Sequence, residues 1–315
     1  MFEVEAVEVG KSLIDKLCRE GLVSSEKLGQ IPVHSKFVNL RHDKQSAICY
    51  FRGDNQLELV VTKDLNFQGI KPKDLEQTCF MWGLKNKPIT IGLGAAGTGK
   101  TTLALSYAIH SLFREERKIV LCKPTVFVGG RSNAIAAVPG DEREKLAPYI
   151  DSYMPGLKRI LGRDADNFIF QWEESGQLQY RAVELLRGQH FEDTVLIIDE
   201  AQNLSLHELC SIVSRVGENS TVIILGDPAQ IDTGEKWFDT GLYMFADSDS
   251  AINSNLTSMV KLEKQYRGPL AKLCSDILEE YNPLEEQDLI VGPEDIRTPL
   301  KSKRRDYPDL SKFFS

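Results

Sequence analysis

Short apolar runs alternate with segments of helical period between residues 89 and 282. The runs are ITIGL, KIVLC, TVLIIDE and TVIILGD. Strands that are apolar on both faces are typical of a parallel sheet that helices cover on both sides. The pattern therefore predicts an α/β domain with a doubly wound parallel sheet. Its start is expected at residue 69, because Pro72 and Asp74 introduce a helical segment (DLEQTCFMWGL) ahead of the first run.

The segments on either side have different patterns. Residues 12–19 place apolar side chains at helical spacing and end at Gly21, which predicts one short helix. Residues 33–62 contain the β-rich runs KFVNLRH, SAICYF and LELVV, separated by turn-prone residues. Residues 1–68 are therefore expected to form a helix and a small antiparallel β module. Residues 283–315 carry four prolines among many charges and are expected to form a C-terminal tail.

Composition narrows the class of protein. The chain has 315 residues, 46 acidic against 38 basic side chains, and a net charge of −8. It is long enough for one large domain or two unequal ones, and its charge argues against coating nucleic acid by bulk attraction. Six scattered cysteines without a CxxC pair indicate neither a zinc site nor a disulfide framework. The acidic N-terminus, and apolar runs far short of the ~20 residues of a membrane helix, predict a cytoplasmic protein with no membrane partner.

The strongest chemical signal is GAAGTGKT at residues 94–101, after a predicted strand and before a helical run. This order is typical of a P-loop, in which backbone N–H groups surround phosphates, Lys100 neutralises the β- and γ-phosphate oxygens, and Thr101 offers a hydroxyl to Mg²⁺. Gly92, Gly94 and Gly97 also fit the dinucleotide pattern GxGxxG, but the GKT ending has no role there. The residues expected to bind nucleotide are Gly94, Ala95, Ala96, Gly97, Thr98, Gly99, Lys100, Thr101 and Thr102.

Two further strands end in polar residues. Asp199 and Glu200 follow the run VLII, and carboxyl ends of parallel strands meet at the edge that carries the P-loop. Asp199 is expected to join Thr101 in the Mg²⁺ shell, and Glu200 to polarise a water for attack on the γ-phosphate. An acidic pair at a strand end is otherwise usually just solvated. After the run TVIILGD, Gln230 is expected to contact the γ-phosphate or the attacking water, whereas Asp227 is expected in an ordinary turn.

In GAAGTGKT, VLIIDEAQN and LGDPAQID, the chain resembles the PhoH family of P-loop ATPases, relatives of superfamily 1 helicases. KPTVFVGG, VPGDEREKLAPYIDSYM and LQYRAVELLRGQHF, which includes Arg187, add to the resemblance, which spans about 70 to 282. It implies a RecA-like fold, ATP and Mg²⁺ as cofactors, action on single-stranded RNA or DNA, and a ring-shaped homo-oligomer, with a hexamer as the candidate size. An ATP-switched regulator that moves no polynucleotide is the alternative. A small-molecule kinase is disfavoured, because a water-polarising Glu200 would favour hydrolysis.

The resemblance also suggests roles for single residues. Gln77 lies where helicase-like ATPases read adenine, although an exposed helix residue explains it equally well. Arg267 resembles the arginine that superfamily 1 proteins bring to the γ-phosphate from a second lobe. Because the chain lacks a second lobe of that size, we expect a neighbouring subunit to supply it.

Two regions outside the ATPase segment carry weaker expectations. Residues 33–77 resemble the connector of longer PhoH proteins that carry an N-terminal PIN nuclease, and we expect that nuclease to be absent here. The basic tail at 301–305, followed by three aromatic residues, suggests either nucleic-acid contact or an arm that docks on a neighbour.

Overall fold

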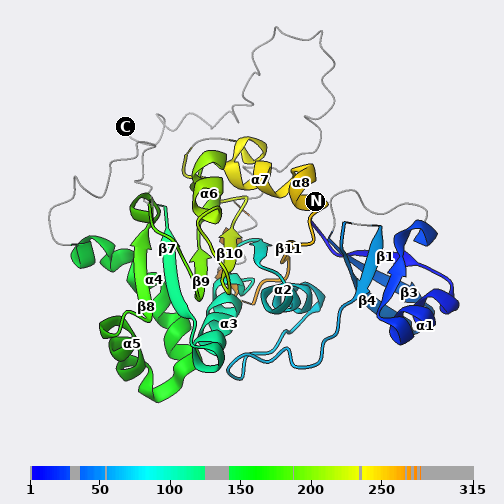
Figure 1. Cartoon of the computed structure of the whole chain (residues 1–315), viewed down its shortest axis with the longest axis horizontal. Helices are drawn as coiled ribbons and strands as arrows, with labels where there is room; N and C mark the ends of the chain where they lie inside the picture. The colour runs from blue at the N-terminus through cyan, green and yellow to red at the C-terminus, as the bar shows by residue number, and fades with distance from the viewer. Residues whose placement is uncertain are drawn as a thin grey trace, which may run out of the picture. The chain divides into compact units, whose positions relative to one another are not determined.

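A six-stranded parallel sheet forms the larger part of the molecule (Figure 1). The computed structural model describes residues 2–28, 36–53, 55–124, 142–186, 188–233 and 236–266, and from the following segment 268–270, 273, 274 and 277. The strands lie in the order β11-β6-β10-β9-β7-β8, and all five pairings are parallel. Their bounds are β6 (Ile89–Leu93), β7 (Lys118–Lys123), β8 (Leu178–Ala182), β9 (Thr194–Ile198), β10 (Thr221–Gly226) and β11 (Thr257–Lys261). The predicted α/β class is confirmed.

Alternating side chains of each central strand enter different cores. Val195 and Ile197 of β9 belong to one cluster, whereas Leu196 and Ile198 belong to the other, and all four are fully buried. Successive side chains of a strand point to opposite faces, so a strand covered on both sides must be apolar at every position. This explains the continuous apolar runs.

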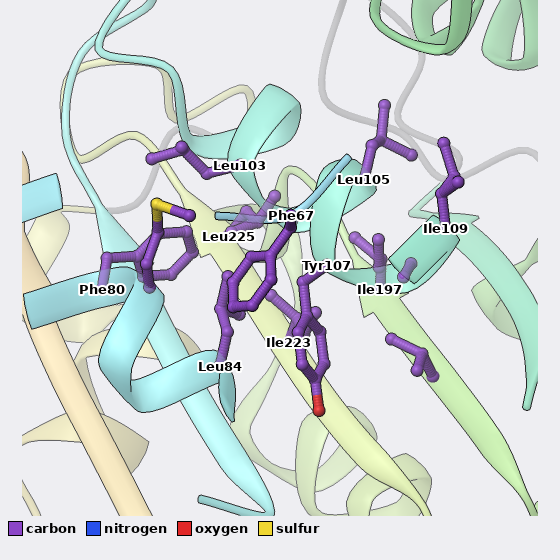
Figure 2. Packing of buried hydrophobic residues seen from close by; sticks show 14 of the residues in the cluster. Phe67, Phe80, Leu84, Leu103, Leu105, Tyr107, Ile109, Ile197, Ile223 and Leu225 are labelled. Atoms are coloured by element: carbon purple, nitrogen blue, oxygen red, sulfur yellow. The ribbon is translucent and has the colours of Figure 1, made fainter. Parts of the chain in front are cut away.

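The described helices that cover the first face all come before β8 in the chain. They are α2 (Leu75–Asn86), α3 (Lys100–Glu115), α4 (Glu142–Leu161) and α5 (Ala165–Glu174), the last two joined by a short 3-10 turn, Gly162–Asp164. Figure 2 shows Phe80 and Leu84 of α2 and Tyr107 of α3 gathered around Ile223 of β10, with Phe67 among them. Burying a side chain of this size contributes about 1.5–3 kcal/mol, so this layer fixes the start of α3 against the sheet.

The second face is covered by three short helices, α6 (Leu206–Val213), α7 (Gly241–Ala246) and α8 (Asp249–Ile252). Ser205 caps the start of α6 with a capping box: its hydroxyl accepts a hydrogen bond from the Glu208 N–H, and the Glu208 carboxylate accepts one from the Ser205 N–H. Among the described residues of this part of the chain, further 3-10 turns lie at Val183–Leu186, Ala201–Asn203 and Trp237–Asp239. Across the described ranges, every helix is too short or too polar to cross a lipid bilayer.

A separate five-stranded sheet lies near the N-terminus, in the order β1-β3-β4-β5-β2. Its elements are β1 (Glu5–Glu8), α1 (Lys11–Glu20), β2 (Leu22–Ser24), the 3-10 turn Ser25–Leu28, β3 (Phe37–His42), β4 (Gln45–Phe51) and β5 (Gln56–Leu59). Leu13, Ile14 and Leu17 of α1 pack on this sheet, and Gly21 ends the helix in the left-handed region. The sheet is mixed and not purely antiparallel, because β1 pairs with β3 in the parallel direction.

Aromatic and cationic side chains join this sheet to the start of β11. The Tyr50 hydroxyl donates to Thr257 O at 2.6 Å, and the Lys87 ammonium lies 4.0 Å from the centre of the Tyr50 ring. The Lys36 ammonium donates to Ser254 O at 2.7 Å and is also near the Tyr50 ring. Two lysines are therefore buried at this contact, and desolvation lowers the pKa of both.

This burial predicts a pH dependence of stability. Burial and, second, the charge of Lys87 lower the pKa of Lys36 from 10.5 to about 7. Between these values the unfolded chain binds a proton at Lys36 that the folded chain does not, so the free energy of unfolding rises with pH, by at most about 1.4 kcal/mol per pH unit. We expect Lys36→Met to reduce this slope between pH 7 and 10 in chemical denaturation, whereas the exposed Lys44→Met keeps it. Equal slopes in wild type and Lys36→Met would contradict this origin.

Candidate functional site

The loop between β6 and α3 has the backbone shape of a phosphate cradle. Gly94, Gly97 and Gly99 all adopt positive φ, of 140°, 92° and 96°. A Cβ at Gly94 would lie 2.2 Å from the carbonyl oxygen of Leu262, so no larger residue fits there. The first N–H groups of α3 are left without helical partners and attract anions.

A cavity of about 610 Å³ opens above this loop. Six of the nine residues expected to bind nucleotide line it: Ala96, Gly97, Gly99, Lys100, Thr101 and Thr102. The other three lie in the loop but do not line the cavity. Gly94 and Ala95 offer their carbonyl oxygens to the Lys100 ammonium, the second at 3.0 Å, and Thr98 is fully buried. Lys100 is thus folded back on its own loop, at the cavity wall.

Thr101 and Asp199 meet across 98 positions of sequence. The Thr101 hydroxyl donates to Asp199 Oδ2 at 3.2 Å, and both residues line the cavity. Burial raises the pKa of the Asp199 carboxyl, and the charge of Lys123 opposes this effect. Mg²⁺ prefers oxygen ligands and keeps several of its waters, so a hydroxyl and a carboxylate at the wall of an open cavity fit it.

Glu200 occupies the turn directly after Asp199. Its backbone is left-handed, with φ of 57°, and its N–H donates to Asp199 Oδ1 at 3.0 Å. The Gln202 amide donates to Glu200 Oε2 at 2.8 Å. Glu200 lines the cavity with its side chain 39% exposed, so this carboxylate reaches solvent water while a buried amide orients it.

Gln202 also ties this turn to the end of β10. Its side chain is fully buried; its amide donates to Gln230 O at 2.7 Å and its oxygen accepts from the Asp227 N–H at 3.1 Å. The Gln230 amide donates to Asp227 Oδ2 at 2.8 Å, and both of these residues line the cavity. Asp227 is therefore more than an ordinary turn residue: it is 6% exposed and burial raises its pKa.

Gln77 lies in the first turn of α2, at another side of the cavity. It is 4% exposed, so the explanation as an exposed helix residue fails. Its amide donates to Thr98 O at 2.9 Å, and its oxygen accepts from the Lys73 N–H at 3.0 Å. Gln77 thus links the P-loop to the segment before α2.

Tyr266 and Lys123 also line the cavity, although they are not among the residues predicted for the site. The Tyr266 N–H donates to Gly97 O at 2.9 Å, and its hydroxyl donates to Asp74 Oδ2 at 2.5 Å. The Lys123 ammonium lies near both Asp199 and Glu200. Lys123 directly follows the apolar run KIVLC, so the rule that strand ends gather at one edge would have found it. Arg267, Arg187 and the tail at 301–305 lie outside the described residues.

The whole arrangement joins a phosphate cradle, an oxygen pair suited to Mg²⁺ and a solvent-reaching carboxylate at one sheet edge. A model of the PhoH-like protein family matches residues 69–279. The chain belongs to the PhoH-like family. It is a P-loop nucleotide-binding protein, as the resemblance implied.

Curated relatives show the same similarity. The PhoH-like chain is 33% identical over 241 residues to Protein PhoH2 of Bacillus subtilis strain 168, covering 70% of this chain and 50% of that protein. It is 29% identical over 269 residues to a PhoH-like protein of the same strain, covering 84% and 78%. The chain therefore spans about half the length of the first relative. Among solved structures, it is similar to the Pif1 helicase from Candida albicans at 15% identity and a TM-score of 0.35, covering 68% of this chain and 44% of that one.

Proposed function

We propose that this PhoH-like chain hydrolyses ATP in an Mg²⁺-dependent reaction and acts, as a ring-shaped oligomer, on RNA or DNA. One observation carries the hydrolase part: the hydrogen bond between the Thr101 hydroxyl and Asp199 at the wall of the P-loop cavity. It brings together the two oxygens that P-loop enzymes use for Mg²⁺.

The residues divide the work of binding. The N–H groups at the start of α3 hold the phosphates. When nucleotide binds, the Lys100 ammonium leaves the carbonyl oxygens of its own loop and binds the β- and γ-phosphate oxygens. Thr101 and Asp199 would hold Mg²⁺, which, when bound, neutralises charge that develops on the phosphate oxygens. The adenine ring of ATP is assigned to the part of the cavity lined by Ile70, Gln77 and Tyr266, which offers an aromatic ring and a side-chain amide.

Glu200 is assigned the proton transfer. It accepts a hydrogen bond from a water, whose oxygen attacks the γ-phosphorus as the bond to the ADP oxygen breaks. The proton passes from the water to the Glu200 carboxylate, and ADP and inorganic phosphate leave. The Gln202 amide orients this carboxylate by donating a hydrogen bond of 2.8 Å to Glu200 Oε2. Gln230, in the turn after β10, contacts the γ-phosphate or the water.

Polynucleotide action and assembly rest on the resemblance to superfamily 1 helicases and PhoH proteins. The net charge of −8 requires any polynucleotide contact to be local. The alternative is a regulator whose ATP state changes partner binding without moving a polynucleotide.

One set of assays separates these functions. ATP turnover is measured with and without single-stranded RNA, single-stranded DNA and duplex, on protein whose oligomeric mass is determined at the same concentration. We expect single strands to raise the turnover rate, and the mass to be that of an oligomer. Turnover that no polynucleotide changes would favour the regulator, and a monomeric mass with full turnover would exclude the ring.

Lys100→Ala tests the phosphate cradle directly. Removing one charge-assisted contact to the phosphates is expected to weaken ATP binding about 10- to 100-fold, and turnover should fall with it. Binding is measured by titrating a fluorescent ATP analogue. Lys118→Ala serves as control, because Lys118 is exposed at the opposite end of β7. Unchanged affinity in folded Lys100→Ala protein would contradict the assignment.

A further inference from the structure

Lys123 places a positive charge directly between the two catalytic carboxylates. Its ammonium lies 3.9 Å from Asp199 Oδ2 and 3.8 Å from Glu200 Oε1. The Lys123 side chain is 13% exposed and lines the same cavity as Lys100 and Thr101. The ammonium therefore lies beside the carboxylate that is expected to hold Mg²⁺, where it would compete with a metal ion for that carboxylate.

The fold holds this lysine in place from two sides. Strand β7 pairs with β9 so that Cys122 lies opposite Ile198, and the Asp199 N–H donates to Cys122 O at 2.9 Å. On the other side, the buried ring of Tyr153 from α4 lies 5.2 Å from the ammonium, and its hydroxyl donates to Cys122 O at 3.4 Å. A cation between an aromatic face and two carboxylates is favoured in this partly buried setting.

Charged groups near Lys123 come from two other strand ends and one helix. Asp199 and Glu200 follow β9, Asp227 follows β10, and Lys100 begins α3. The Lys100 ammonium donates to the loop carbonyls of Gly94 and Ala95, whereas the Lys123 ammonium lies 3.9 Å from Asp199 Oδ2 and 3.8 Å from Glu200 Oε1.

We propose that Lys123 is a positioning residue that occupies the carboxylate pair before nucleotide arrives and thereby opposes the binding of free divalent cations. This inference rests on the proposed function. A free metal ion has to displace the ammonium from Asp199, and nothing then compensates the added positive charge. A metal ion that arrives with ATP brings the phosphate charges with it, and these accept the displaced ammonium. Metal and nucleotide therefore enter together, and Lys123 keeps Glu200 oriented from the side opposite to Gln202.

The test measures metal binding without nucleotide. Mn²⁺ is titrated into the nucleotide-free full chain, and the free ion is followed by electron paramagnetic resonance. Lys123→Met is expected to bind Mn²⁺ about tenfold more tightly than wild type, because the competing cation is gone. Lys123→Arg keeps the charge and should behave like wild type, as should Lys118→Met at the far end of the same strand.

Two further variants keep the result unambiguous. Lys123→Gln repeats the charge removal should the methionine variant fail to fold. In the Lys123→Gln background, Asp199→Asn should abolish the gain in Mn²⁺ affinity, which assigns the metal to this pair. Mn²⁺ affinity that is unchanged or weaker in folded Lys123→Met or Lys123→Gln overturns the inference. Tighter Mn²⁺ binding in a chain whose wild type never turns over ATP would refute the proposed hydrolysis while leaving the role of Lys123 standing.

Discussion

Arg267→Ala is expected to lower ATP turnover by about 10³–10⁵-fold, the range by which a γ-phosphate arginine accelerates other nucleotide hydrolases. A guanidinium at the γ-phosphate would stabilise negative charge that grows on the transferring phosphoryl group, so nucleotide affinity should change much less than the turnover number. Steady-state turnover and ATP binding are measured on the same preparation. An equal loss of both would instead make Arg267 a binding or structural residue.

A mixing experiment then determines which chain supplies the arginine. Its neighbour Tyr266 donates its N–H to Gly97 O of the same chain, which favours action within the chain. The proposed ring-shaped oligomer would instead allow a neighbouring subunit to donate the arginine. If the neighbour supplies it, mixing Arg267→Ala with Lys100→Ala partly restores activity, because one interface joins an intact P-loop to an intact arginine. Mixed oligomers that are confirmed by mass but remain inactive would place Arg267 in its own chain's site.

Glu200→Gln is expected to keep ATP binding and to lower turnover by about 10²–10⁴-fold, the usual effect of losing a general base. The amide retains the shape of the carboxylate and a hydrogen bond with Gln202, while Asp199 and Thr101 remain available for Mg²⁺. Binding of a fluorescent ATP analogue and release of phosphate are compared in one preparation.

The matched control for this change is Glu174→Gln, at the exposed end of α5. It removes one carboxylate without touching the cavity and should leave turnover unchanged. If Glu200→Gln weakens Mg·ATP binding as much as it lowers turnover, Glu200 binds the metal or has a structural role, and it is not the general base.

The central strands could be predicted because burial on both faces leaves a continuous apolar run, as in VLII of β9. The edge strands carry no such signal. In the six-stranded sheet the edge strands are β8, which reads LQYRA, and β11, which reads TSMVK, and polar residues interrupt the apolar ones in both. An edge strand has a neighbouring strand on one side only and tolerates polar side chains. Its position as a strand therefore follows from backbone pairing and cannot be recognised from the apolar pattern.

The site could be predicted as far as local motifs and the strand-end rule reach. Thr101 and Asp199 were expected together and are hydrogen-bonded. Tyr153 and Tyr266 could not be placed in the same way. Tyr153 reaches Lys123 only because α4 packs on α3 and the sheet. Tyr266 reaches Gly97 because β11, which the apolar pattern did not predict, pairs in parallel with β6 and ends beside the P-loop. Such contacts depend on tertiary packing, which local spacing does not encode.

The parallel sheet also separates the molecule into a reactive edge and an edge that is free for engineering. The P-loop, Asp199, Glu200, Asp227 and Lys123 all lie at the carboxyl ends of strands, whereas Glu218 and Asn219 precede β10 at its amino end and are exposed. Six strand residues span roughly 20 Å, so a peptide tag inserted between Glu218 and Asn219 stays away from bound nucleotide. That position offers an attachment point for immobilising the chain on a surface with its reactive edge facing solution.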